Sequence, residues 1–359
     1  MIGWNAIALL AATTLAPSAP LPAPDQIMQI PPALHEQLEQ KVIRPTHSQE
    51  LRLQKLVELV FRADGLGLQY DPEATLTVAE TFTARRANCL SFTLLFVALA
   101  REAGLDARVQ EVGQVVTWYQ NQGVIYNAGH VNVGLRMGDR EGTVDLDRSV
   151  LYDRRGPRRI SDQRALAHFY NNRGAELMAD GDVTSARAHY GMALQLDPRF
   201  VSSWNNLGVL DARLGDLTAA ARDFNTALSI NGQHAPALSN ATALYRRMGD
   251  TRRASLLSTR LQRAQRQDPF YQFMRGVEAE RQGDYAGAVT YYRHAVNLYG
   301  NAHQFHFGLA RAYFLSGNNR NAARELELAR KLGDSSETQA RYQAKLDSLH
   351  RISARTAAH

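Results

Sequence analysis

Apolar residues in the first third of the chain follow helical spacings and then switch to alternation. Residues 49–63 carry apolar side chains at the spacing of one helix face, and residues 33–42 and 75–85 also predict helices. Residues 90–103 are almost entirely apolar and are followed by Gly104, a residue typical of helix ends. The pattern therefore predicts four helices before the first long strand.

Strand-like alternation begins after Gly104. Residues 108–116 are β-rich, and residues 130–137 alternate between apolar side chains and polar ones or glycine, which predicts a half-buried strand. The sequence GDREG supplies a turn, and the alternation then resumes, so we expect a β-hairpin. Four side chains with hydrogen-bonding or titratable groups share one face by parity: His130, Asn132, Asp145 and Asp147.

The second half of the chain repeats itself every 34 residues. Glycines followed by Asp or Asn recur at this period, with Ala five residues later and a small residue seven residues earlier. The five glycines are Gly181, Gly215, Gly249, Gly283 and Gly317. This residue pattern resembles the tetratricopeptide repeat, in which small residues let two antiparallel helices approach closely. The third repeat departs, because Ser258 stands where Tyr190 and Phe224 stand in others.

Composition and charge limit the classes of partner. The chain is 45% hydrophobic and 21% charged, with a net charge of +6 and a pI near 9.5. The excess is Arg-rich and spread along the chain, without an RNP motif, zinc finger or basic zipper, so no nucleic acid is expected. By the layout of the repeat family, five arginines should lie on or near the concave face and could seat an acidic peptide: Arg213, Arg246, Arg247, Arg281 and Arg311.

The N-terminus resembles a secretory signal. Its apolar stretch, residues 6–12, is too short to span a bilayer and leads into small residues such as Ala16 and Ala19. No Lys or Arg precedes the apolar run. We expect a periplasmic or cell-envelope protein, or a cytoplasmic one if this segment is not a signal.

The single cysteine, Cys89, stands where a reactive thiol could form. One cysteine excludes an internal disulfide and any zinc site built from several cysteines. Asn88 is a favoured N-cap, so Cys89 would lie in the first turn of a helix, where the dipole and free N–H groups favour a thiolate and could hold an oxyanion. A thiolate needs a base and an orienting carboxylate, which His130 and either Asp145 or Asp147 could supply. Parity alone cannot choose between the two aspartates.

The segment RANCLSFTLLFVALAREAGL, followed by a strand, a histidine on a hairpin strand and an aspartate on the next, resembles the transglutaminase-like superfamily over about residues 75–150. The resemblance implies a papain-like α+β fold, with Cys89 as nucleophile, His130 as base and Asp145 as orienting acid. The family's usual spacing favours Asp145, and Asp147 is the alternative. The join to repeats beginning ALAHFYNNRGAEL is similar to a group of bacterial proteins with both modules.

These observations predict an α+β transglutaminase-like domain followed by an all-α repeat solenoid. The expected divisions are a signal or linker (1–32), the transglutaminase-like domain (33–153), a linker around RRGPRR (154–166), five repeats (167–336) and a capping helix with a tail (337–359).

The expected function is that of a cysteine enzyme that hydrolyses an amide or ester of a protein or peptide, with the repeats recruiting the substrate or a partner. The alternative is a non-catalytic scaffold with a degenerate domain, since the aromatic and Pro that often follow the family's His and Asp are Val131 and Leu146 here. No GxSxG, HExxH, P-loop or GxGxxG occurs, and neither cofactor nor metal is implied.

Overall fold

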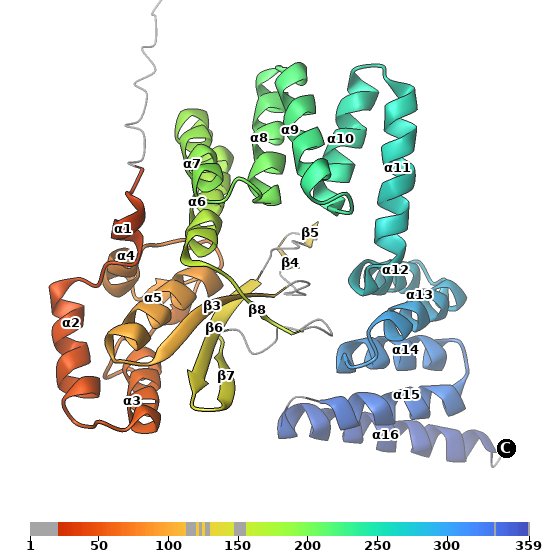
Figure 1. Cartoon of the computed structure of the whole chain (residues 1–359). Helices are drawn as coiled ribbons and strands as arrows, with labels where there is room; N and C mark the ends of the chain where they lie inside the picture. The colour runs from red at the N-terminus through yellow and green to blue at the C-terminus, as the bar shows by residue number, and fades with distance from the viewer. Residues whose placement is uncertain are drawn as a thin grey trace, which may run out of the picture.

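The structure is a computed structural model that describes residues 21–112, 120–121, 124–125, 130–146, 156–333 and 335–357. An α+β N-terminal part is followed by a long helical solenoid, which confirms the expected fold class (Figure 1). The expected signal segment in residues 1–20 and the alternative acid Asp147 lie outside the described residues. Within the described part, no helix has both the length and the apolar character needed to cross a membrane.

The N-terminal part is built around one apolar helix, α5 (Cys89–Glu102). Its residues from Leu90 to Ala100 are all buried, as expected for a helix that is hydrophobic on every side. Asn88 caps it by accepting a hydrogen bond from the Ser91 N–H at 2.9 Å, and the chain turns away at Gly104 with φ of +77°. The helices around it are α1 (Pro24–Ile27), α2 (Pro32–Leu38), the π-helical turn η1 (Glu39–Ile43), α3 (Gln49–Phe61) and α4 (Val78–Ala84).

Residues 24–32 form part of the folded domain, which corrects the expected linker. Ile27 is fully buried in the same hydrophobic cluster as the α5 side chains, and the Tyr170 hydroxyl donates a hydrogen bond to the Pro22 carbonyl at 2.6 Å. The prolines do not prevent helix formation because Pro24 and Pro32 each open a helix, where a missing N–H costs nothing.

The main sheet is antiparallel, with strand order β7-β6-β3-β8. The predicted hairpin is confirmed: Met137 pairs with Arg140, so its two-residue turn is Gly138-Asp139, with Gly138 at φ of +58°. The strands are β1 (Gln69–Tyr70), β2 (Arg86–Ala87), β3 (Asp106–Val112), β4 (Gln120–Asn121), β5 (Val124–Ile125), β6 (His130–Met137), β7 (Arg140–Val144) and β8 (Arg158–Arg159).

The expectation that β6 is half-buried is wrong. His130 is 2% exposed and Asn132 is fully buried, although both belong to the polar set of the alternation. The polar face is covered because Asp145 lies over these two side chains and the Gln110 side chain lies over Gly134. Polar side chains that are buried against one another on a strand indicate a candidate functional site.

The solenoid consists of antiparallel helix pairs in the predicted 34-residue register. Asp or Asn side chains cap the second helix of every pair, and the preceding glycine has φ between +77° and +87°. The helices are α6 (Asp162–Ala179), α7 (Val183–Leu196), α8 (Val201–Leu214), α9 (Leu217–Ile230), α10 (Ala235–Arg247), α11 (Thr251–Arg266), α12 (Pro269–Arg281), α13 (Tyr285–Leu298), α14 (His303–Leu315), α15 (Asn319–Leu332) and α16 (Ser336–Ala357).

In several helix pairs a glycine on the first helix makes room for an aromatic ring on the second helix. A Cβ on Gly208 would lie 2.7 Å from the Phe224 ring, and similar contacts join Gly174 to Tyr190 and Gly276 to Tyr292. In the third repeat the glycine position is Thr242 and the aromatic position is Ser258, so the larger residue faces the smaller in the sequence register. The third repeat therefore departs from the glycine–aromatic pattern at both positions.

The first repeat is packed into the N-terminal part, so the predicted linker ends earlier than expected. Helix α6 begins at Asp162, and its Ala165 and Phe169 belong to the same hydrophobic cluster as the α5 side chains. Arg101 at the end of α5 donates two hydrogen bonds to the Asp162 carboxylate, at 2.7 and 2.9 Å. The N-terminal part and the first repeat share one core.

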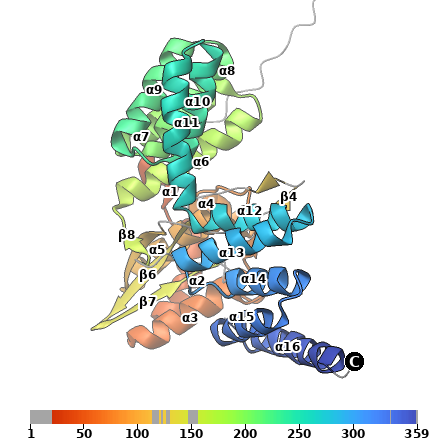
Figure 2. The same ribbon diagram turned by 90° about the vertical axis from the view of Figure 1, so that its right-hand side faces the viewer.

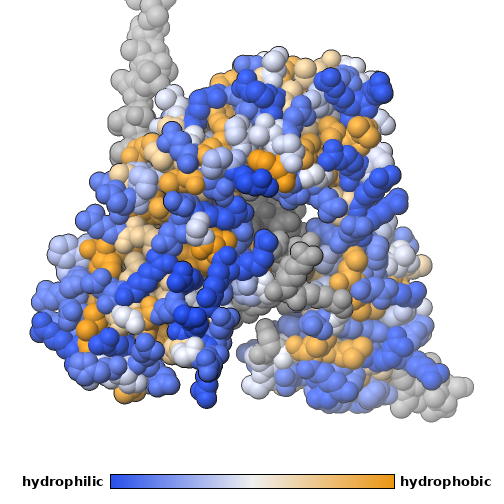
Figure 3. Space-filling model, viewed as in Figure 1, coloured by the Kyte–Doolittle hydropathy of each residue, from blue (hydrophilic) through white to orange (hydrophobic). Residues whose placement is uncertain are grey.

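The solenoid forms two stacks, α6–α11 and α12–α16. The stack α6–α11 lies above the sheet and α12–α16 lies opposite it (Figures 1 and 2). In the space-filling view a notch separates the N-terminal part from the lower end of the second stack (Figure 3). The buried apolar clusters divide at the same place, because one ends on α11 and the next begins on α12.

Gly208→Ala should destabilise the protein by about 1–3 kcal/mol, because its new methyl group would overlap the ring of fully packed Phe224. Gly191→Ala is the matched control: it lies inside α7 with no atom within 4 Å of the new Cβ, so helix propensity should stabilise by about 0.5–1 kcal/mol. Urea unfolding midpoints measure both. Equal effects of the two substitutions would contradict the close helix approach.

Candidate active site

Cys89 occupies the first turn of α5 and is partly exposed. Two side chains fix the backbone around it. Asn88 caps the helix with its Oδ1 while its Nδ2 donates to Thr75 Oγ1 at 2.8 Å. Thr93, one turn further on, donates its hydroxyl to the Cys89 carbonyl at 2.7 Å and lies 3.3 Å from the Val131 carbonyl. The helix start is therefore tied to the strand that carries His130.

His130 lies between the thiol and a carboxylate. Its Nε2 is 2.7 Å from Asp145 Oδ2, and the side chains are 2% and 10% exposed. The Cys89 side chain lies close enough to the ring to help raise the pKa of His130. Because Nε2 is engaged by Asp145, Nδ1 is the ring nitrogen left for the thiol. The structure thus brings together the three side chains that the sequence singled out, in a linear Cys–His–Asp arrangement.

The hairpin register selects Asp145. With Gly138-Asp139 as the turn, Val133 pairs with Val144, and one further step puts Asp145 across from Asn132. Sequence parity left this choice open because it depends on where the turn is centred.

The charge of His130 is controlled by its partners. Burial opposes protonation, but the hydrogen bonds to Asp145 and Cys89 outweigh it and raise the pKa of His130 to about 10. The imidazole is therefore protonated at neutral pH in this arrangement. An imidazolium beside a thiol favours thiolate formation.

Asn132 is a further member of the site. Its side chain is fully buried, and its Nδ2 donates to Asp145 Oδ2 at 3.2 Å, the same oxygen that contacts His130. Asn132 therefore limits the rotation of the carboxylate that orients the histidine. The alternation of β6 had placed Asn132 on the His130 face, but nothing in the sequence showed which group it would bind.

Two family models match the chain. The family model of the transglutaminase-like superfamily core matches residues 36–140, a range that contains Cys89 and His130 and ends before Asp145. A tetratricopeptide-repeat model matches residues 171–236 and 273–337, on either side of the atypical third repeat. The chain joins a transglutaminase-like domain to tetratricopeptide repeats.

No curated protein matches the chain. Solved structures similar to part of it include MamA from Desulfovibrio magneticus RS-1, which is 17% identical and covers 49% of this chain and 99% of its own, with a TM-score of 0.27. YrrB, described as a TPR protein with an unusual peptide-binding site, is 16% identical, with coverages of 50% and 92% and a TM-score of 0.27. PilF of Pseudomonas aeruginosa is 15% identical, with coverages of 53% and 95% and a TM-score of 0.29.

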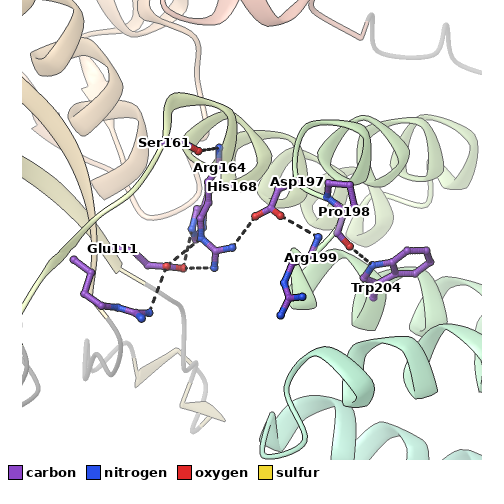
Figure 4. Close-up of polar contacts among 9 residues, drawn as sticks. Glu111, Ser161, Arg164, His168, Asp197, Pro198, Arg199 and Trp204 are labelled. Atoms are coloured by element: carbon purple, nitrogen blue, oxygen red, sulfur yellow. Dashed lines mark hydrogen bonds and ion pairs between the residues drawn. The ribbon is translucent and has the colours of Figure 1, made fainter.

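The transglutaminase-like domain is joined to the repeats by a charged cluster around Glu111 (Figure 4). The Arg164 guanidinium donates to both Glu111 oxygens, at 3.1 and 3.0 Å, and also to Asp197 at 2.7 Å. His168 Nε2 is 3.1 Å from Glu111 Oε1. Burial would raise the pKa of Glu111, but the hydrogen bonds from His168 and Arg164 prevail and lower it to about 2.

Glu111 also borders the catalytic strand. It pairs with Val131 across β3 and β6, next to the pair of Val112 with His130. Neither Glu111 nor its neighbour Gln110 is exposed: Gln110 is 8% exposed, and Glu111 is largely covered by the repeat residues.

The five arginines that were predicted to bind a partner differ in their surroundings. Arg213 and Arg247 line a groove between α8 and α10. Arg311 lines a second groove on α14 and pairs with Glu280 at 2.6 Å. Arg281 pairs with Glu278 on its own helix, and Arg246 is exposed near the end of α10. The structure thus offers two grooves, while a role of these residues in binding stays a prediction.

Glu111→Gln should lower the free energy of unfolding at pH 7 by on the order of 1–3 kcal/mol, because it removes the charge of one of the two carboxylates that pair with Arg164, the other being Asp197. The wild-type carboxyl has its pKa lowered from 4.5 to about 2, so it stabilises above pH 4.5 and this contribution is lost as pH falls toward 2. The difference between wild type and variant should shrink between pH 5 and pH 3.

Glu141→Gln is the matched control, since this glutamate is on β7 of the same sheet and pairs with Arg159 but is 66% exposed. It should change stability by less than about 1 kcal/mol. Denaturant titrations at several pH values compare the two. A pH-independent gap for Glu111→Gln would rule out the ionised contact.

Proposed function

We propose that the protein is a cysteine hydrolase of the transglutaminase-like class, acting on an amide or ester carbonyl of a protein or peptide. The observation that carries the proposal is the buried contact of His130 with Asp145 on one side and Cys89 on the other. Nucleophilic catalysis by a thiol needs this set: a nucleophile, a base that also donates protons, and a group that holds the base in place.

The first half of the reaction forms a thioester. The Cys89 sulfur, as thiolate beside protonated His130, attacks the carbonyl carbon, and the carbonyl π electrons move to oxygen. Backbone N–H groups of the first turn of α5 stabilise the oxyanion; the Ser91 N–H is already taken by Asn88, which leaves those of Cys89 and Leu90 for this task. The oxyanion collapses, the bond to the leaving amine or alcohol breaks, and His130 gives the leaving group its proton.

The second half releases the acyl group. Neutral His130 takes a proton from water, the hydroxide oxygen attacks the thioester carbon, and the C–S bond breaks to give a carboxylic acid and the thiolate. Asp145 keeps the ring oriented through both halves, and Asn132 holds Asp145. We favour water over an amine as the acceptor because no acidic or aromatic feature of the described residues marks an amine site.

The repeats supply the protein-interaction role of the molecule. The second stack, α12–α16, lies opposite the sheet that carries His130 (Figures 1 and 2). A protein held on this stack would be kept near the domain that we propose cleaves it. The signal-like N-terminus supports a periplasmic or cell-envelope location.

Iodoacetamide alkylation tests the Cys89–His130 pair, since Cys89 is the only cysteine. At pH 6 the wild type should be alkylated about tenfold faster than His130→Ala, because the imidazolium favours the thiolate. His35→Ala is the control: this histidine is 45% exposed and contacts Glu102 instead. Mass spectrometry of the intact protein follows the reaction. An inert Cys89 in the wild type would favour the non-catalytic scaffold.

The acyl acceptor can be assigned with p-nitrophenyl acetate. Attack by Cys89 releases p-nitrophenolate and leaves an acetyl thioester, which water should hydrolyse in repeated turnovers. Cys89→Ala, which removes the nucleophile, should show no turnover above the uncatalysed rate, and Asp145→Asn should lose about 10²–10⁴-fold. Added cadaverine should leave the rate unchanged and give no acetylated amine. Amide formation in place of acetate would make the enzyme a transamidase.

A further inference from the structure

An apolar groove of about 640 Å³ lies at the C-terminal end of the solenoid, between α14, α15 and α16. Its volume is within the range of ligand-binding pockets. The apolar lining includes Phe307, Ala310, Leu326 and Leu349, and the cationic lining consists of Arg311, Arg341 and Lys345. Phe314, at one side of the groove, is 41% exposed, so the apolar surface is open to solvent.

Two of the three cations have no acidic partner in the described part of the chain. Arg311 is balanced by Glu280, at 2.6 Å. Lys345 instead lies over the Phe307 ring, 5.4 Å from its centre, and Arg341 donates only to the Thr338 hydroxyl, at 3.2 Å. Two positive charges therefore stand at the edge of an apolar surface without compensation.

The groove differs from the rest of the solenoid at one repeat position. Counted in steps of 34 residues, the position of Arg311 and Lys345 is Val209, Ala243 and Val277 in the second to fourth repeats. Only the last repeat and α16 carry cations there. Arg311 is 46% exposed and its charge is balanced by Glu280, whereas Lys345 is exposed and has no acidic partner among the described residues, so its charge is available to a bound anion.

We infer that this groove binds a partner protein through a short segment that presents a large apolar side chain flanked by carboxylates. The apolar side chain fills the space above Ala310 and Leu326, and the carboxylates pair with Arg341 and Lys345. Small buried alanines in the floor, Ala310 and Ala322, leave room for such an anchor. Opposite charges at the rim give the pairing its specificity and speed its association.

The groove defines which kind of partner the repeats would bind. This inference rests on the protein-interaction role proposed above and is independent of the Cys89 mechanism. The groove lies on the stack opposite the catalytic sheet (Figure 2). An acidic segment bound there would be held on the stack that lies opposite the transglutaminase-like domain (Figure 1).

The test is direct binding of a fluorescein-labelled twelve-residue peptide with a Leu-Leu-Phe centre and Glu residues on both sides, followed by fluorescence anisotropy. The full-length protein should bind it, and the same peptide with Lys in place of Glu, or Ser in place of the apolar centre, should bind about tenfold more weakly or not at all. Binding should weaken as salt is raised. Equal binding of all three peptides would overturn the proposal.

Groove variants locate the site. Arg341→Glu with Lys345→Glu should weaken peptide binding by about tenfold or more, and Ala344→Trp should block it by filling the exposed rim. Lys331→Glu is the matched charge reversal: it lies on α15, is 62% exposed and is not part of the groove lining. The Lys331→Glu variant should bind the peptide like the wild type. If it loses as much affinity as the groove variants, the loss reflects net charge and the groove is not the binding site.

Two further measurements separate the possible failures. Cys89→Ala should bind the peptide normally, and the groove variants should keep the wild-type rate of Cys89 alkylation, so loss of one property leaves the other measurable. Vesicles containing phosphatidylglycerol provide the competing ligand. Binding to these vesicles that depends on Arg341 and Lys345, without peptide binding, would overturn the peptide assignment in favour of an anionic lipid.

Discussion

The carboxylate of Glu111 is the contact on which the junction of the two parts of the chain depends. It accepts hydrogen bonds from Arg164 and lies against His168, and Arg164 also reaches Asp197 at the end of α7. This acid, whose side chain is 16% exposed, therefore connects the central sheet with both helices of the first repeat. Leaving it without its cations would cost free energy, so the ion pairs favour docking of the sheet against the first repeat.

The same junction fixes the site. Glu111 stands on β3 directly beside the β6 residues that follow His130. At the other end, the Thr75 N–H donates to Glu176 of α6 at 3.3 Å, and the Thr75 hydroxyl accepts from the Asn88 cap at 2.8 Å. Helix α6 thus contacts β3, the neighbour of the strand that carries His130, through Glu111. It also contacts Thr75, which binds the Asn88 cap before Cys89. A repeat helix acts as a supporting wall of the candidate active site, in addition to any role in binding partners.

Much of this architecture could be predicted from local sequence. The Asn88 cap, the hairpin and the 34-residue register follow from backbone preferences that depend little on context. The choice of Asp145 required the turn position, which differs by one residue between two plausible turns. The surroundings of Glu111, Asn132 and Ile27 could not be predicted, because they are formed by segments distant in the chain. Alternation predicts which face a residue takes, but it does not predict what covers that face.

The repeats show how one sequence pattern serves two purposes. Where variation changes two facing positions together, as for Thr242 with Ser258, it concerns the packing of a helix pair and needs no ligand to explain it. Where variation replaces Val or Ala by Arg311 and Lys345, it sacrifices apolar contact and adds charge that the described residues only partly neutralise. Substitutions of the first kind maintain the solenoid. Among those of the second kind, Arg311 is balanced within the solenoid by Glu280, and Lys345, which has no acidic partner among the described residues, is the one whose charge a ligand from outside would complete.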